Sequence, residues 1–131
     1  MPKTAISRRV TRGGVKTEFT EVAKTIDIPE GSMKVIETGG KKILLARSEG
    51  RFYCADGTCP HLGGNLWEGT LHGTVITCPF HHSQFDLTNG SVIRWTDLTG
   101  IILVLAKKTR PPHPLRVYPV KIEGDRILVG L

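Results

Sequence analysis

Four residues in two short motifs carry the chemistry that this sequence suggests. Cys59 and His61 form a C-x-H motif, and Cys78 and His81 form a C-x-x-H motif after 16 intervening residues, 62 to 77. A thiolate sulfur suits iron–sulfur clusters and zinc, and an imidazole suits zinc, copper and iron. A proline follows each cysteine and restricts the backbone there. The two motifs therefore predict one metal site held by two stiff loops.

Two kinds of metal site fit this ligand set. Zinc could bind two cysteines and two histidines tetrahedrally, although the C-x-H spacing is short for a zinc site. The short spacing suits ligands that go to two adjacent irons, one held by two cysteines and the other by two histidines. His72 and His113 are expected to be surface or turn residues. Cys54, the third cysteine, is expected to be a small buried apolar residue.

The segments around these motifs read as short strands. The chain has 131 residues, which fits one domain, and its 15 glycines and 8 prolines favour turns over long helices. Alternating or apolar runs bounded by turn residues predict strands. The main expected strands are 19–23, 25–28, 33–38, 42–47, 51–55, 75–77, 84–87, 91–93, 115–122 and 126–129.

We expect an all-β fold of antiparallel sheets. Residues 18–53 and 96–131 would form a basal barrel or sandwich, and a smaller metal-binding subdomain, about 54–95, would be inserted in it. One short helix near 97–108 is predicted because five apolar residues, 98 to 106, recur on one helical face. This helix would pack on the β core or dock a partner.

The net charge of +6 is unevenly distributed. Residues 1–16 carry five basic residues and no acid, so 1–17 is expected to be a basic flexible tail without a specific nucleic-acid partner. Residues 52–93 contain Asp56, Glu68 and Asp86 and no lysine or arginine. The net charge of this stretch is −3. It predicts a partner protein with a neutral or basic docking face, and a rate of reaction with that partner that falls as the salt concentration rises.

The number of cysteines and the length of the apolar runs indicate the cellular compartment in which the protein is expected. Three cysteines and no visible export signal argue against a disulfide scaffold and favour the cytoplasm. No apolar run approaches the roughly 18 residues that a membrane span needs, so no membrane span is expected.

The two motifs and their flanks resemble the cluster loops of Rieske proteins. The matching segments are residues 59–66 and 78–86, and the strand and turn rhythm is similar to that of Rieske-type ferredoxins over about 18–131, least so at 96–114. The resemblance implies one [2Fe-2S] cluster per chain, with Cys59 and Cys78 on the inner iron. His61 and His81 would bind the outer iron, which takes the electron.

The residues around the ligands indicate which kind of Rieske protein this is. Quinol-oxidising subunits have an extra cysteine pair, and Gly64 and Phe80 occupy those positions here. Ser83 keeps a hydroxyl found in those subunits, whereas Phe85 stands where they have tyrosine, and His82 stands where the family commonly has glycine. Fewer hydroxyls near the sulfurs predict a potential in the lower part of the family's range of about −150 to +300 mV.

The predicted function is one-electron transfer by a protein that is not itself an enzyme and has no catalytic residues. Oxygenase subunits of this type need a further two-histidine, one-carboxylate iron site, and the three remaining histidines lack its spacing. The leading interpretation is a soluble low-potential ferredoxin that takes electrons from a redox protein such as a reductase and feeds an oxygenase or related redox enzyme. A fixed small subunit of a larger reductase, as in nitrite reductases, and a non-redox zinc module are the alternatives. The donor, the acceptor and the oligomeric state are left open.

Overall fold

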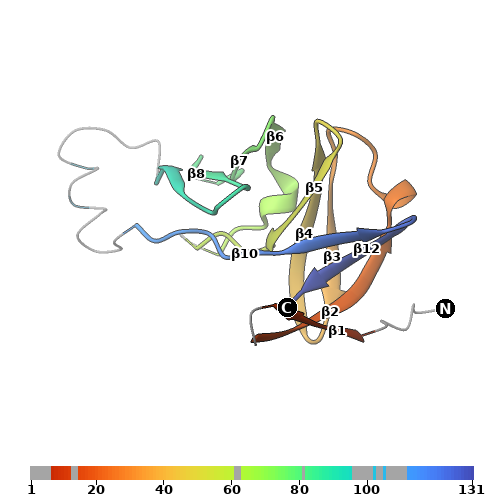
Figure 1. The fold of residues 1–131 in the computed structure, drawn as a ribbon. Helices are drawn as coiled ribbons and strands as arrows, with labels where there is room; N and C mark the ends of the chain where they lie inside the picture. The colour runs from red at the N-terminus through yellow and green to blue at the C-terminus, as the bar shows by residue number, and fades with distance from the viewer. Residues whose placement is uncertain are drawn as a thin grey trace.

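The computed structural model describes residues 7–12, 15–60, 63–80, 82–95, 102, 105 and 112–131. Within these residues the chain forms three antiparallel sheets of four strands each (Figure 1). Two sheets make up the basal part, and the third, smaller sheet lies to one side of them. The predicted all-β fold with an inserted smaller subdomain is confirmed.

The first basal sheet joins the two ends of the chain. Its order is β1 (Ser7–Arg12), β2 (Val15–Lys24), β12 (Arg126–Gly130) and β11 (Val120–Glu123). Strand β2 pairs with β12 from Phe19–Gly130 to Lys24–Arg126, with one irregularity in register. The C-terminal strands therefore complete the sheet that the N-terminal strands begin.

The second basal sheet has the order β10 (Val117–Tyr118), β5 (Arg51–Asp56), β4 (Lys41–Ser48) and β3 (Met33–Thr38). Gly39 and Gly40, both at positive φ, form the turn between β3 and β4, as the sequence predicted. The expected strand 115–122 is divided at Pro119 between β10 and β11, which belong to different sheets.

The third sheet consists of short strands between β5 and β10 in the chain. Its order is β6 (Thr70–His72), β7 (Val75–Thr77), β8 (Gln84–Asp86) and β9 (Val92–Arg94). A short 3-10 helix, η2 (Leu66–Glu68), leads into it. These strands lie within the segment 54–95 in which the sequence predicted a metal-binding subdomain, although β5 runs to Asp56, so residues 54–56 belong to the basal sheet.

Strand β4 contributes to two hydrophobic cores. Leu44 and Ala46 belong to a core that reaches into the third sheet, whereas Ile43 and Leu45 belong to a core shared with β2 and β12. All four side chains are fully buried. Successive side chains of a strand point to opposite faces, so this apolar run connects the basal sheets to the subdomain that carries the candidate ligands.

Three expectations are corrected or lie outside the described residues. Ser7–Arg12 is no flexible tail, because β1 pairs with β2 along its whole length; Gly13-Gly14 between these strands in the sequence is a hairpin signal that the charge argument overlooked. Thr25–Asp27 is a 3-10 helix (η1) and no strand. The helix predicted near 97–108 lies outside the described residues except for Ile102 and Leu105, which are exposed. Nowhere in the described part of the chain is there a helix long and apolar enough to span a bilayer.

Candidate metal centre

The first candidate loop, residues 59–64, begins and ends on a closed backbone frame. Thr58 and Asn65 pair as an isolated antiparallel bridge. Inside it, the N–H of Cys59 donates to the carbonyl of Gly64 at 2.8 Å, and the N–H of Gly63 donates back to the carbonyl of Cys59 at 2.9 Å. The position of the cysteine is therefore fixed by the backbone on both sides.

The second candidate loop, residues 78–83, has the same frame. Thr77 and Gln84 pair between β7 and β8, and the N–H of Cys78 donates to the carbonyl of Ser83 at 2.8 Å. The amide of Gln84 also donates to the hydroxyl of Thr77 at 3.2 Å. In each loop the cysteine comes first and bonds to the carbonyl five residues later, so the two loops present their cysteines in the same way.

The fifth residue of each loop adopts a left-handed backbone. Gly63 has φ +77° and His82 has φ +56°. Left-handed backbone is uncommon for residues with a Cβ, so this conformation suits Gly63 better than it suits His82. The carbonyl of His82 accepts a hydrogen bond from Nε of Arg94 at 3.0 Å, a contact with β9 that sequence reasoning missed.

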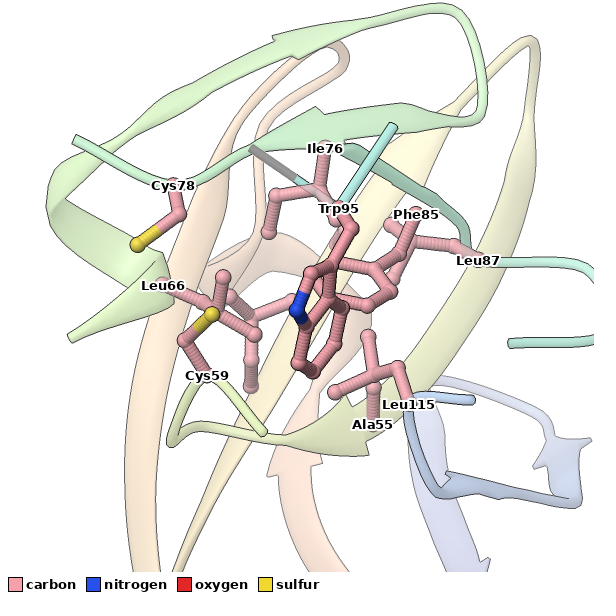
Figure 2. Close-up of a cluster of buried hydrophobic side chains, with 11 residues drawn as sticks. Ala55, Cys59, Leu66, Ile76, Cys78, Phe85, Leu87, Trp95 and Leu115 are labelled. Carbon is pink, nitrogen blue, oxygen red and sulfur yellow. The ribbon is translucent and has the colours of Figure 1, made fainter. Parts of the chain in front are cut away.

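The sulfur atoms of Cys59 and Cys78 lie at one end of a buried cluster (Figure 2). Each cysteine is only 2% exposed, and neither forms a disulfide. Burial and the nearby Cys59 sulfur raise the pKa of Cys78 to about 11, although the backbone N–H of Phe80 lowers it. A metal that binds here must therefore displace a proton from the thiol.

The absence of a side chain at Gly64 lets the Phe80 ring and the Cys78 sulfur lie close to the backbone of the first loop. A Cβ at this position would lie 3.0 Å from Sγ of Cys78 and 2.4 Å from Cδ2 of Phe80. The Phe80 ring is 57% exposed and shields the site from one side. Two adjacent, buried thiols fit a group that binds both sulfurs. The positions of the second cysteine pair are taken by Gly64 and Phe80.

Ser83 uses its hydroxyl differently from the expectation. The hydroxyl is fully buried and donates to the backbone carbonyl of Trp95. Trp95 in turn packs edge-on against Phe85, with ring centroids 6.4 Å apart, and against His113 at 5.4 Å. Ser83 therefore ties the second loop to the residue that follows β9, a partner that no sequence motif announces.

The other two candidate ligands, His61 and His81, lie outside the described residues. Among the described residues no three or more histidine, cysteine or acidic side chains come together as a metal site. The cysteine half of the predicted ligand set is thus brought together, and the histidine half stays a prediction. Cys54 is buried, as expected, on β5.

Comparison with known proteins decides the family. The family described as the Rieske [2Fe-2S] domain matches residues 18–119, which include both loops. This chain belongs to the Rieske [2Fe-2S] domain family. A Rieske domain is one that carries a [2Fe-2S] cluster held by cysteine and histidine, and the two buried cysteines that the loops bring together fit the cysteine half of that ligand set.

Relatives of this Rieske domain are named as electron-transfer components. The ferredoxin component of an alkene monooxygenase system from Xanthobacter autotrophicus is 32% identical over 86% of this chain and 81% of its own. The ferredoxin component of a naphthalene 1,2-dioxygenase system from Pseudomonas aeruginosa is 32% identical over 87% of this chain and 96% of its own. A solved complex of oxygenase and ferredoxin in carbazole 1,9a-dioxygenase matches with a TM-score of 0.68 and 26% identity, over 86% of this chain and 92% of that chain. These names confirm an electron-transfer component rather than an enzyme.

Proposed function

We propose that this chain is a ferredoxin that carries one electron at a time to an oxygenase. One [2Fe-2S] cluster per chain would be held by Cys59, Cys78, His61 and His81. The observation that carries the proposal is the matched pair of loops, which places two buried, disulfide-free cysteines side by side within a Rieske domain. The relatives named as ferredoxin components support the oxygenase as the acceptor.

The chain's own residues would hold and enclose the cluster. When bound, a Rieske cluster accepts and donates single electrons. Cys59 and Cys78 would hold one iron in the buried part of the site, and Gly64 lets the Phe80 ring pack close beside the Cys78 sulfur. Phe80 covers the sulfurs on one side, and the Leu66 and Trp95 side chains pack in the core beneath them. No residue needs to act as an acid, base or nucleophile.

A low reduction potential is part of the proposal. Hydrogen bonds to cluster sulfur raise the potential because they stabilise the more negative reduced state. Phe85 offers no hydroxyl, and the hydroxyl of Ser83 donates to the carbonyl of Trp95. Both observations support a value in the lower part of the range of about −150 to +300 mV.

An EPR-monitored redox titration tests the proposal directly. The protein is purified anaerobically, and iron and zinc are assayed on the same sample. A Rieske-type signal with two irons per chain and a low midpoint potential is expected. A high positive potential would contradict the low-potential ferredoxin, and bound zinc without a signal after cluster reconstitution would contradict electron transfer.

Substitution of the ligands tests the site. Cys59→Ser, His61→Ala, Cys78→Ser and His81→Ala should each abolish the signal and the bound iron. Cys54→Ser and His72→Ala remove the same residue types elsewhere and should retain both. Loss of iron in the controls to the same extent would show general unfolding, and the ligand assignment would then lose its support.

Free diffusion between partners and a cytoplasmic location complete the proposal. The three cysteines are all free and buried, which suits a reducing compartment. A subunit fixed in a larger reductase would co-purify with it, so a monomer in size-exclusion chromatography at all concentrations supports the ferredoxin. Cell fractionation tests the compartment.

A further inference from the structure

Three basic side chains meet beside the first loop. A shallow hollow of about 300 Å³ is lined by Lys41, Lys42, Asp56, Thr58, Arg116 and Tyr118. These residues come from three segments far apart in the sequence. The hollow reaches Thr58, the residue directly before the proposed ligand Cys59.

Backbone hydrogen bonds fix these segments together. The N–H of Gly57 donates to the carbonyl of Lys42 at 2.9 Å, and the N–H of Asp56 donates to the carbonyl of Arg116 at 2.9 Å. The start of β4, the end of β5 and the chain just before β10 thus form one surface at the edge of the second sheet. The basic side chains stand on a rigid frame that continues into the first loop.

The local charge is positive, in contrast to the sequence stretch 52–93. The only acid lining the hollow is Asp56, whose carboxylate accepts the phenol O–H of Tyr118 at 2.5 Å. Lys42 also lies 3.8 Å from the exposed Glu37. Three cations against these two acids leave 3 − 2 = +1, and only Asp56 lies within the hollow itself.

Of the three acids that make residues 52–93 negative, only Asp56 lines the basic hollow. Asp86 lies in the third sheet, where it accepts hydrogen bonds from the N–H and the hydroxyl of Thr88. Glu68 is on η2, and Asn65 donates to it at 3.4 Å. The three acids thus lie on β5, η2 and β8, whereas Lys41, Lys42 and Arg116 line one hollow.

We propose that Lys41, Lys42 and Arg116 form a docking face for an acidic protein surface of a redox partner. The inference rests on the proposed electron transfer and reverses the sequence-based expectation of a neutral or basic partner. Carboxylates of the partner would pair with the three cations and bring the partner against Thr58 and the first loop. Charge complementarity of this kind steers association and fixes orientation.

A protein surface fits this face better than a small free anion. Lys41, Lys42, Thr58 and Arg116 are all exposed. The ammonium groups of Lys41 and Lys42 lie 5.7 Å and 5.8 Å from the ring centres of Tyr118 and Trp67. Exposed charges hold one small ion weakly, whereas several carboxylates on one surface engage them at the same time.

Stopped-flow oxidation of the reduced, cluster-loaded protein tests this docking face. The probes are anionic hexacyanoferrate(III) and cationic tris(phenanthroline)cobalt(III). For the double variant Lys41→Glu/Arg116→Glu, we expect the rate with the anionic probe to fall about tenfold at low salt and the rate with the cationic probe to rise. The control, Lys34→Glu/Lys121→Glu, changes the net charge equally on strands β3 and β11 and should leave both rates within about twofold.

Competition distinguishes the class of partner. Poly-L-glutamate should slow the anionic probe with the wild type but not with the Lys41→Glu/Arg116→Glu variant, whereas phosphate of equal charge concentration should have little effect. Equal inhibition by phosphate would show a small-anion site and overturn the inference. Equal effects of both double variants would also overturn it. A protein without a reducible cluster would instead contradict the proposed function.

Discussion

At the scale of single residues, the backbone explains a departure from the family. The fifth position of each loop is left-handed, and the chain places glycine at Gly63 but histidine at His82. A residue with a Cβ costs roughly 1–2 kcal/mol in this conformation. The second loop therefore holds a strained residue next to a proposed ligand, a place where strain commonly persists because its surroundings fix it.

Replacing this histidine should stabilise the protein. His82→Gly is expected to raise the free energy of unfolding by about 1 kcal/mol, because glycine adopts positive φ freely. Gly63→Ala is the reciprocal control and should lower it by a similar amount, since a Cβ there would meet only Thr58 Cγ2 at 3.9 Å. Urea unfolding of both variants measures the effect, and a destabilised His82→Gly variant would show that the imidazole contributes more than its strain costs.

The buried hydroxyl of Ser83 should matter for stability more than for potential. Ser83→Ala leaves the carbonyl of Trp95 without this donor, which costs roughly 1–3 kcal/mol when the group is buried. The reduction potential should stay at the wild-type value, because the hydroxyl donates to this backbone carbonyl. If Ser83→Ala keeps the stability of the wild type but has a lower reduction potential in the redox titration, the hydroxyl donates to a cluster sulfur instead.

Tyr118 should ionise only at an unusually high pH. Burial, followed by the hydrogen bond to the Asp56 carboxylate, raises the pKa of Tyr118 to about 12. A raised pKa stabilises the fold fully below the ordinary phenol value of about 10, and this contribution is lost as the pH rises through 12. Phenolate absorbance followed with pH should lose the step near pH 12 in Tyr118→Phe, and Asp56→Asn should move that step to lower pH. An unchanged titration in Asp56→Asn would contradict the role of the carboxylate.

At the scale of elements, local sequence signals predicted what local interactions determine. The Gly39-Gly40 turn and the apolar strand β4 are encoded within a few residues, and both appear as expected. Contacts between residues that lie far apart in the sequence could not be predicted from such local signals. The hydrogen bond from Ser83 to Trp95 and the approach of Arg116 to Asp56 depend on sheet packing.

Gly69 and Gly73, both at the third sheet, are required for different reasons. Gly69 has no space for a side chain, whereas Gly73 has the space but a left-handed backbone. Gly69 has an ordinary φ of −85°, but a Cβ there would lie 1.9 Å from the carbonyl oxygen of Thr77. Gly73 has φ +58° and nothing within 4 Å of such a Cβ. Gly69→Ala should therefore cost more than about 3 kcal/mol, and Gly73→Ala about 1 kcal/mol. Chemical unfolding compares them, and equal losses would mean that the backbone at Gly69 yields easily.

At the scale of the whole molecule, the charge pattern shows the limit of reading a sequence in windows. Residues 52–93 are negative as a segment, but β4 and the chain before β10 bring Lys41, Lys42 and Arg116 next to the first loop. The basic N-terminal segment was likewise expected to be a tail, and the structure places Ser7–Arg12 at the edge of the first sheet. In both cases the sheet order decided the outcome.

The two loops stand on different parts of the molecule, and this affects more than electron transfer. Cys59 follows the basal strand β5, whereas Cys78 stands between β7 and β8 of the third sheet. A group bound to both sulfurs would cross-link the two parts, as a disulfide does, and would close a loop of the chain between them. Limited proteolysis of cluster-free protein is therefore expected to begin between residues 59 and 95, while the loaded protein resists. In a cell short of iron, the lifetime of the polypeptide would then follow the supply of its metal.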